Sequence, residues 1–365
     1  MFKSFKYALL GLAGLLALST PVGVFGAGVS AGSARGAAAP RPMFAVVHRA
    51  SSRTAIASAV NTWQFSYTYL GTTYKDTFVG TNPTTGATTT VPVYIIPIKL
   101  TYGTFVTNPN TRLSNGKTVV QNTTASPIFK KLTYIQGGTN VGSTQYVDAF
   151  QRASLWGTVS AHPTYHVLLG KPVIKPLQSL RVPAADGSVG NPFGTKLLIA
   201  SINWFDPLAA GMISSLGIPA GALPIFVTTQ TYLSNNSGLS GCCIGGYHNV
   251  SGAGQPYAMF TYIQTPGQFS QDVSALSHEI GEYVNDPFTN NINVPASCFT
   301  NLIYEVGDPL ENEANYGDYP YALNGFTYHL QDLVTPVYFG APGSTSVHGW
   351  STFQGTSLLV CQNGG

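Results

Sequence analysis

The residues best suited to chemistry lie close together in the segment SQDVSALSHEIGEYVNDP, residues 270–287. His278 and Glu282 are four positions apart, so on a helix both side chains lie on one face and reach a single ion. Glu279 lies beside them. An ion held by an imidazole and a carboxylate acidifies a water molecule, and a neighbouring carboxylate that is not a ligand can accept the water's proton. The spacing therefore predicts metal-assisted hydrolysis, with Glu279 as the catalytic general base.

A metal site of this kind needs a third ligand, and the acidic stretch that follows the segment offers one. Glu305, in the sequence YEVGD, is the candidate third ligand. Asp308 and Asp286 are expected to support the site, with Asp308 accepting the free ring N–H of His278. His248 is a candidate for an additional ligand or a hydrogen-bond donor, and a loop histidine outside the site is the alternative.

The same segment carries the signals of an amphipathic helix. Ser270 is the expected N-cap and Pro287 the expected end. One face is apolar, formed by Val273, Leu276, Ile280, Tyr283 and Val284. The opposite face is acidic, and like charges at positions 282 and 286 disfavour a helix that lacks a counter-ion. The alternative is an ordinary surface helix whose acidic face is solvated.

One imidazole and two carboxylates form an oxygen-rich ligand set. Zn²⁺ is the first candidate for the ion, and Mn²⁺, Fe²⁺ and Ca²⁺ stay open as alternatives. The lack of a second imidazole also agrees with a structural or degenerate site that binds metal without catalysis.

The motif HEIGE at residues 278–282, followed by EVGD at residues 305–308, resembles the active site of zincin metallopeptidases. The resemblance is to the gluzincin type, which takes a glutamate as its third ligand. The family motif is HExxH, and this chain has HExxE because Glu282 stands at the second histidine position. The resemblance implies that His278 and Glu305 bind the metal.

The resemblance also implies a fold. Zincins have a mixed twisted sheet with an active-site helix, and the strand before that helix forms the substrate-binding edge. Residues 257–263 (YAMFTYI) lie where that strand is expected. The cysteine-bearing, exported character of the chain is also similar to that of the exordium-like proteins.

The charged residues divide the chain. All 17 lysines and arginines lie at or before Lys196, and residues 197–365 hold 11 of the 14 acidic residues. The basic residues are scattered, with Lys130–Lys131 as the only doublet, so we do not expect nucleic-acid binding. The acidic half therefore needs the basic half or a bound cation to neutralise it.

The chain begins like an exported protein. Two lysines precede the apolar run of residues 7–18, and small residues follow. We expect a signal peptide at residues 1–26 and a flexible leader at residues 27–55. An uncleaved anchor is the alternative. The mature protein is expected to be secreted, extracellular or periplasmic, and free of the membrane once the signal is removed.

The four cysteines are expected to form two disulfides in the oxidising environment outside the cell. They are Cys242, Cys243, Cys298 and Cys361. A bridge between the adjacent pair is the least favoured pairing, because Cα atoms joined by a trans peptide are only about 3.8 Å apart. Each member of the pair is therefore expected to reach one of the distant cysteines.

Apolar runs separated by turns predict an α+β fold with a strand-rich N-terminal part. We expect a basic strand-rich lobe at residues 56–235 and an acidic lobe, with the disulfides and the metal site, at residues 236–365. A single domain over residues 56–365 is the alternative. His329 alternates with apolar residues and is expected to pack in the core. The predicted strands are residues 91–102, 165–169, 197–202, 223–229 and 257–263, and the other predicted helices are residues 144–156 and 207–216.

These features predict a secreted metal-dependent hydrolase, a peptidase that acts on peptide or protein substrates. The alternative is a non-catalytic secreted or cell-surface binding protein with a structural or degenerate metal site. Its Gly-, Thr-, Tyr- and Asn-rich surface would suit cell-wall or carbohydrate contact. In a third interpretation no metal binds, and the acidic half packs on the basic half.

Overall fold

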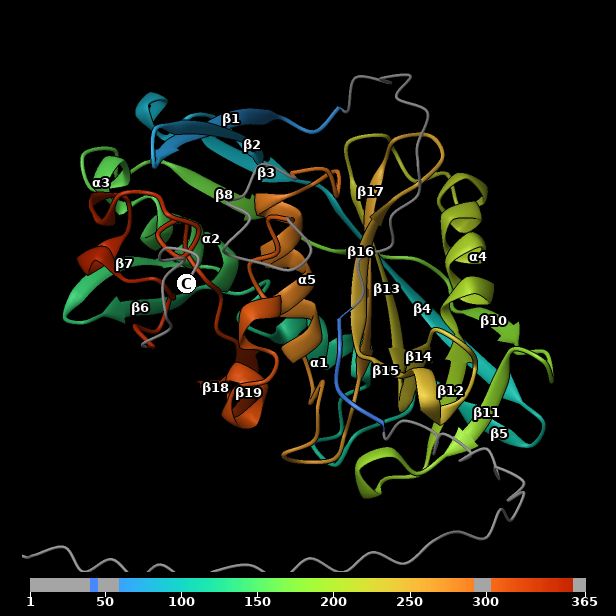
Figure 1. Ribbon diagram of the computed structural model, residues 1–365. Helices are drawn as coiled ribbons and strands as arrows, with labels where there is room; N and C mark the ends of the chain where they lie inside the picture. Colours follow the sequence, from blue (N-terminus) through green and yellow to red (C-terminus); the bar gives the residue numbers. More distant parts are fainter. Residues whose placement is uncertain (1–39, 45–58, 292–302, 357–365) are drawn as a thin grey trace, which may run out of the picture. The chain divides into compact units, whose positions relative to one another are not determined.

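The apolar runs form the central sheet of the protein, which a computed structural model describes over residues 40–44, 59–291 and 303–356 (Figure 1). The sheet has seven strands in the order β10-β4-β13-β17-β16, and β5 and β9 also pair with β4. The strands β4, β13 and β17 are parallel, and β16 is antiparallel to β17 at one edge. Their bounds are β4 Val93–Tyr102, β5 Phe105–Thr107, β9 Val173–Ile174, β10 Gln178–Arg181, β13 Leu223–Thr229, β16 Gly246–Val250 and β17 Pro256–Tyr262. The expectation that the strand before the active-site helix forms the edge is therefore wrong, because β16 covers β17.

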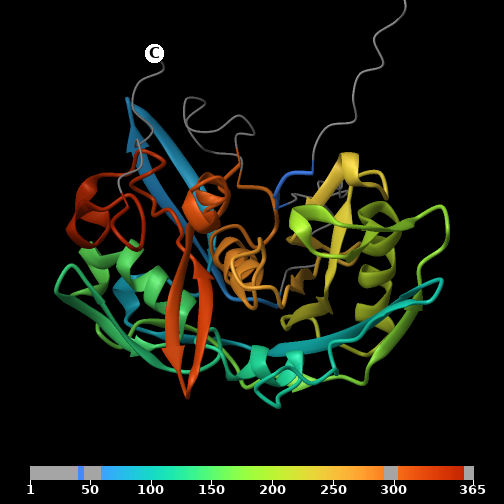
Figure 2. The same ribbon diagram turned by 90° about the horizontal axis from the view of Figure 1, so that it is seen from below.

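Two helices cover opposite faces of this sheet (Figures 1 and 2). Successive side chains of a strand point to opposite faces, so β4 contributes to two cores. Val93 and Ile95 belong to the core beside α5 (Ser274–Asn285), whereas Ile96 and Ile98 belong to the core beside α4 (Ile202–Ser215).

The helix α5 is enclosed by protein and not by water. It packs against the central sheet, α2 (Tyr146–Ser154) and the strands β2 (Thr72–Val79) and β19 (Phe326–Gln331). Every residue of α5 is buried, so the interpretation of a surface helix with a solvated acidic face is wrong. The helix begins at Ser274 and not at Ser270, whose φ of 63° is left-handed and whose hydroxyl donates to the carbonyl oxygen of Thr261. The predicted C-terminal end before Pro287 is confirmed.

The remaining elements form smaller sheets around this centre, and the whole described part is α+β, as predicted. The five strand predictions are confirmed, and α2 confirms much of the helix expected at residues 144–156. Helix α4 begins before the predicted residue 207. The additional strands are β1 Thr62–Tyr69, β2 Thr72–Val79, β3 Thr88–Val91, β6 Leu132–Gln136, β7 Thr139–Thr144, β8 His166–Leu169, β11 Gly187–Gly190, β12 Leu197–Ser201, β14 Thr231–Ser234, β15 Cys242–Ile244, β18 Asp318–Leu323 and β19 Phe326–Gln331, and the additional helices are α1 Val119–Ala125, α2 Tyr146–Ser154 and α3 Trp156–Val159.

The expected boundary between a basic and an acidic lobe falls inside a sheet. Strands β14 and β15 lie on either side of residues 235–236 and pair with each other. The described residues all belong to one compact unit, Ala38–Gly365. Among them, no helix combines the length and apolarity that crossing a membrane requires.

The disulfide prediction is wrong for Cys242 and Cys243, which are bonded to each other. The prediction assumed a trans peptide, but the peptide between them is cis and their Cα atoms are 3.0 Å apart. Cys298 and Cys361 lie outside the described residues, as do the signal peptide and most of the leader.

Gly281 allows the close packing of α5, and Gly281→Ala is expected to lower the free energy of unfolding by about 1–3 kcal/mol. A Cβ atom there would lie 2.5 Å from Cδ1 of the buried Leu333. Gly211→Ala in α4 is the control, because no atom lies within 4 Å of its added Cβ. Helix propensity then raises stability by about 0.5–1 kcal/mol. Urea denaturation of both variants measures the difference, and equal stabilisation would contradict this account of α5.

Candidate metal centre

His278 presents one ring nitrogen to two carboxylates and has the other fixed by an amide. Its Nδ1 atom is 2.5 Å from Oε1 of Gln331, the last residue of β19. An amide oxygen can only accept, so Nδ1 carries the proton and donates it. The Nε2 atom faces Oε1 of Glu282 at 2.8 Å and Oδ1 of Asp308 at 3.5 Å. The prediction that Asp308 accepts the free ring N–H of His278 is therefore wrong. Asp308 lies instead at Nε2, together with Glu282, on the side of the imidazole that would bind an ion.

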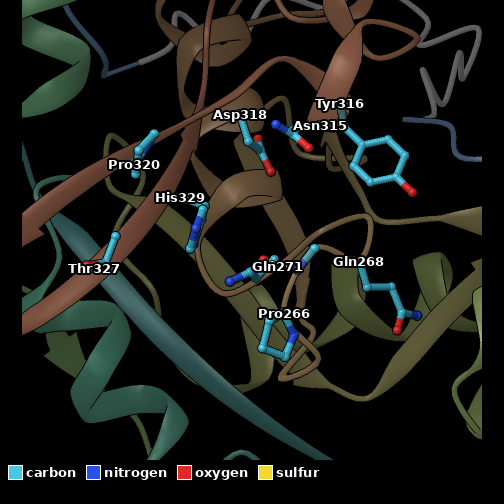
Figure 3. A pocket seen from close by; sticks show the side chains of 10 residues that line it. Pro266, Gln268, Gln271, Asn315, Tyr316, Asp318, Pro320, Thr327 and His329 are labelled. Atoms are coloured by element: carbon cyan, nitrogen blue, oxygen red, sulfur yellow. Dashed lines mark hydrogen bonds between the residues drawn. The ribbon is translucent and has the colours of Figure 1, made fainter.

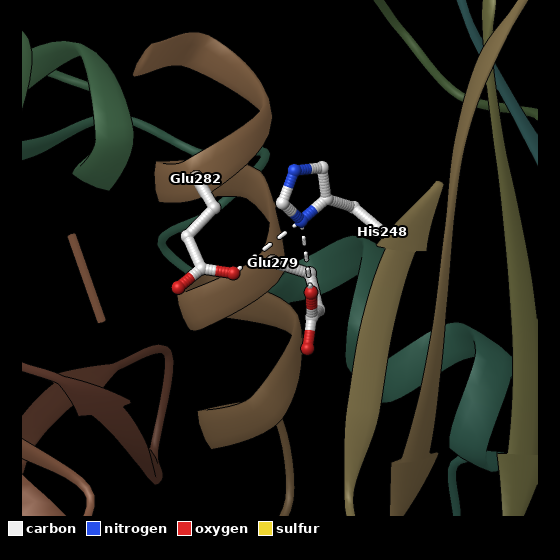
Figure 4. A group of neighbouring side chains, drawn as sticks. All are labelled: His248, Glu279 and Glu282. Carbon is white, nitrogen blue, oxygen red and sulfur yellow. Dashed lines mark ion pairs between the residues drawn. The ribbon is translucent and has the colours of Figure 1, made fainter. Parts of the chain in front are cut away.

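His248 is held in the same manner on the neighbouring strand β16. Its Nε2 atom is 3.2 Å from the backbone oxygen of Asp286, at the end of α5. Its Nδ1 atom faces Oε2 of Glu279 at 3.6 Å and Oε2 of Glu282 at 3.4 Å (Figure 4). The histidine that the sequence marked only as an additional candidate thus shares carboxylates with the motif helix.

Five of the predicted site residues form two groups of converging ligand atoms. One group is His278, Glu282 and Asp308, and the other is His248, Glu279 and Glu282. Within each group the ligand atoms lie within 4.8 Å of one another. Glu282 belongs to both because its two oxygens face different imidazoles.

Glu305, the predicted third ligand, belongs to neither group. Its side chain is fully buried, and neither carboxylate oxygen has a hydrogen-bond partner within the described part of the chain. The chain turns between Glu305 and the short 3₁₀ helix η4 (Asp308–Leu310), and this turn brings Asp308 to His278. Glu305 instead adds negative charge near Glu282.

Asp286 supports the site mainly through its backbone. Its carbonyl oxygen lies at His248, whereas its carboxylate accepts hydrogen bonds from the backbone N–H groups of Asn290 and Asn291. Burial raises the pKa of Asp286 to about 6. The predicted supporting residue therefore caps the loop after α5.

The electrostatics of the centre reflect acids that are buried together. Burial raises the pKa of Glu279 to about 7, despite His248 and His278. Burial and the neighbouring Glu282 raise the pKa of Glu305 well above its usual range. Burial would also raise the pKa of Glu282, but His278 and His248 hold it well below its usual value.

The two imidazoles show the converse effect. Burial lowers the pKa of each ring, yet Glu305 at His248 and Glu282 at His278 help to raise both pKa values well above 6.5. Without an ion, protons on these rings must supply the positive charge that the carboxylates need. A divalent cation supplies it better, since imidazole nitrogens and carboxylate oxygens are the usual zinc ligands. The residues present therefore fit a bound metal ion.

Two glycines let backbone and functional side chains approach each other. A Cβ atom on Gly307 would lie 2.2 Å from Nδ1 of His278, and one on Gly246 would lie 2.5 Å from Oε1 of Glu279. Sequence reasoning missed both glycines and Gln331. The sequence offered one signal for the two glycines, their positions along the chain. Gly307 lies between Glu305 and Asp308, and Gly246 lies two residues before His248.

A short N-terminal segment covers the centre. Residues 40–44, expected to belong to a flexible leader, exchange backbone hydrogen bonds with Cys242, Cys243 and Gly245. The Phe44 ring stacks on the imidazole of His278, with centroids 3.6 Å apart. The backbone N–H of Phe44 donates to Oε2 of Glu311. His278 and Glu279 are 0% exposed, so the centre is closed in this structure.

A separate open pocket of about 420 Å³ lies between the loop before α5 and the β18–β19 hairpin (Figure 3). Gln271, Tyr316, Asp318 and His329 are among its lining residues. His329 is partly exposed, and its Nδ1 atom lies 2.7 Å from Oδ2 of Asp272, so the prediction that it packs in the core is wrong. Burial raises the pKa of Asp318 to about 8.

Comparison with known proteins identifies no relative. No family model matches the sequence, and no curated protein or solved structure is significantly similar to it. A function therefore has to be inferred from the geometry of the residues themselves.

Glu305→Gln is expected to stabilise the metal-free protein at pH 7 relative to the unchanged chain. Burial raises the folded-state pKa of Glu305 above its ordinary value of 4.5, so the native carboxyl reduces stability as the pH rises above 4.5. A neutral amide has no such cost. The gain is expected to be absent near pH 4 and to grow towards pH 7.

Chemical denaturation in a chelator, repeated across this pH range, measures the effect. The exposed Glu313→Gln is the matched control for the loss of a carboxylate that is not buried. A gain for Glu305→Gln that is independent of pH would contradict the account.

Proposed function

We propose that the protein is an exported, metal-dependent hydrolase with a zincin-like arrangement, and that its substrates are peptides or proteins. One observation carries the proposal. The buried helix α5 presents His278 and Glu282 to a common point with Asp308, and places a further carboxylate, Glu279, beside them. A ligand set with a carboxylate beside it can supply both the ion that acidifies water and the base that accepts its proton.

The ion, with zinc as first candidate, would be held by His278, Glu282 and Asp308, and it would replace the direct 2.8 Å contact between Nε2 of His278 and Oε1 of Glu282. When bound, it supplies Lewis acidity and lowers the pKa of water. Gln331 fixes the tautomer and orientation of His278. Glu279 accepts the proton, and the pKa of about 7 that burial gives it suits a general base at neutral pH. Asp308 thus takes the ligand position first expected of Glu305.

The sheet suggests where a substrate backbone would lie. In the zincin arrangement the substrate pairs with an edge strand beside the helix, and here β16 is the strand at that edge. It is antiparallel to β17, and both strands pack on α5. An exported location agrees with the disulfide of Cys242 and Cys243, since disulfides persist in oxidising compartments.

Access for a peptide requires the cover to open. Phe44 stacks on His278, and the side chains of His278 and Glu279 are fully buried, so residues 40–44 must separate from the centre before a peptide reaches Glu279. Phe44→Ala is expected to raise the rate of casein cleavage several-fold, because it removes this stacking contact. Phe353→Ala, at a buried ring on another part of the core, controls for general loosening. Equal rates for Phe44→Ala and the unchanged protein would contradict the required opening.

The burial of the site, in which Asp308 alone is partly exposed, favours one competing function. A structural ion needs no access, and a site with Glu282 at the second histidine position can bind metal without turnover. The protein would then be a secreted binding protein, and the open pocket with Tyr316 and Asp318 would be its contact for carbohydrate or cell wall. In that case chelation lowers the melting temperature, and no peptide is cleaved.

Glu279→Gln distinguishes the two functions. It is expected to reduce casein cleavage by about 100-fold or more, the usual contribution of a general base, while the ion at His278 stays bound. Elemental analysis and the cleavage rate are measured on the same preparation. Glu313→Gln serves again as the exposed control. Cleavage by Glu279→Gln at the unchanged rate would rule out the proposed catalytic role.

A further inference from the structure

We propose that His248, Glu279 and Glu282 form a second divalent-cation site, and that an ion bound there inhibits hydrolysis (Figure 4). The site shares Glu282 with the first group but has its own imidazole. The existence of this site does not depend on the proposed function, whereas its inhibitory effect does.

The separations of the ligand atoms suit an ion better than a direct hydrogen bond. The Nδ1 atom of His248 is 3.4 Å from Glu282 and 3.6 Å from Glu279. Charge-assisted hydrogen bonds from nitrogen to carboxylate are roughly 2.7–2.9 Å long. Tetrahedral ligands that each lie about 2.0–2.2 Å from a zinc ion are roughly 3.3–3.6 Å from one another. These two separations therefore match edges of such a tetrahedron.

His248 is oriented as a metal ligand. Its Nε2 atom is directed at the backbone oxygen of Asp286, which can only accept, so the proton lies on Nε2. The lone pair of Nδ1 is then directed at the two carboxylates. A carbonyl acceptor on the far nitrogen is the usual arrangement behind a ligating imidazole.

Glu279 is the second ligand and lacks other partners. It is 0% exposed, and neither of its oxygens has a hydrogen-bond partner in the described residues. The contact with Gly246 positions its carboxylate against β16. A buried carboxylate without donors is costly unless it meets positive charge. The residues from 197 onwards contain no lysine or arginine, so a cation is the fitting partner.

Glu282 allows both ions to bind together. Its Oε1 atom faces His278 and its Oε2 atom faces His248, so the carboxylate can bridge. The nearby carboxylates of Glu305 and Asp308 offset the repulsion between two cations. The second ion engages the lone pairs with which Glu279 would accept a proton. The first ion is therefore expected to activate the protein and the second to inhibit it.

Calorimetric titration of the metal-free full chain with zinc chloride tests the site, with elemental analysis at saturation. Two ions per chain are expected, one bound more weakly. His248→Asn is expected to bind one ion and to lose the weaker transition, whereas the control His329→Asn binds two. Should His248→Asn not fold, judged by circular dichroism, Glu279→Gln serves in its place and is also expected to bind one. One ion per unchanged chain, or two in both site variants, would overturn the proposal.

Casein cleavage across the same zinc range tests the inhibition. The rate of the unchanged protein is expected to rise with the first ion and to fall about 100-fold or more with the second. The His248→Asn variant lacks the second site, so its cleavage rate is expected to stay at its own maximum as the zinc concentration rises further. Two ions without cleavage at any zinc concentration would support the site and refute the proposed function. One ion with cleavage would refute the site alone.

Discussion

The centre of this protein is governed by the burial of negative charge in a part of the sequence that contains no lysine or arginine. Glu279, Glu282 and Glu305 are buried together, and no lysine or arginine occurs from residue 197 onwards. A carboxylate taken out of water must be protonated, paired or bound to a cation. The raised pKa values of Glu279 and Glu305 and of both imidazoles express the same constraint. The proposed metal ion would satisfy it with side chains that are already in place.

The fold makes this burial tolerable by holding each polar group from a different element. The helix α5 provides the motif, β16 provides His248, and the end of β19 provides Gln331. Because these elements pack against one another with glycine at the closest approaches, each imidazole has one nitrogen fixed and one free for a ligand. Such preorganisation is what a metal site needs and what a solvated acidic helix lacks.

The segment of residues 40–44 covers the candidate metal centre, which therefore differs from an active site that is open to solvent. The segment ending at Phe44 is joined to β15 and its neighbours by backbone hydrogen bonds, and its ring lies on His278. The same contact that protects a buried charge cluster also blocks access to it. In the proposed hydrolase, stability and turnover would make opposite demands on residues 40–44, whereas a structural ion would require only that this segment stay closed.

The helix spacing and the strands could be predicted from the sequence because they depend on residues that are neighbours along the chain. The spacing of His278, Glu279 and Glu282 follows from helix periodicity, and the strands follow from apolar runs such as VPVYIIPIKLTY. The start of α5 was misplaced at Ser270, since the tertiary contact of its hydroxyl with Thr261 competes with its use as a cap.

Contacts between distant segments could be decided only by the tertiary structure. Gln331 lies 53 residues from His278, and His248 reaches Glu279 only because β16 lies beside α5. The choice of Asp308 over Glu305 depends on how one turn of the chain is oriented, which no spacing rule specifies. The sequence by itself determined which residue types could bind an ion and on which helix. Packing decided which of their atoms converge, because convergence depends on how elements far apart in the chain are placed in space.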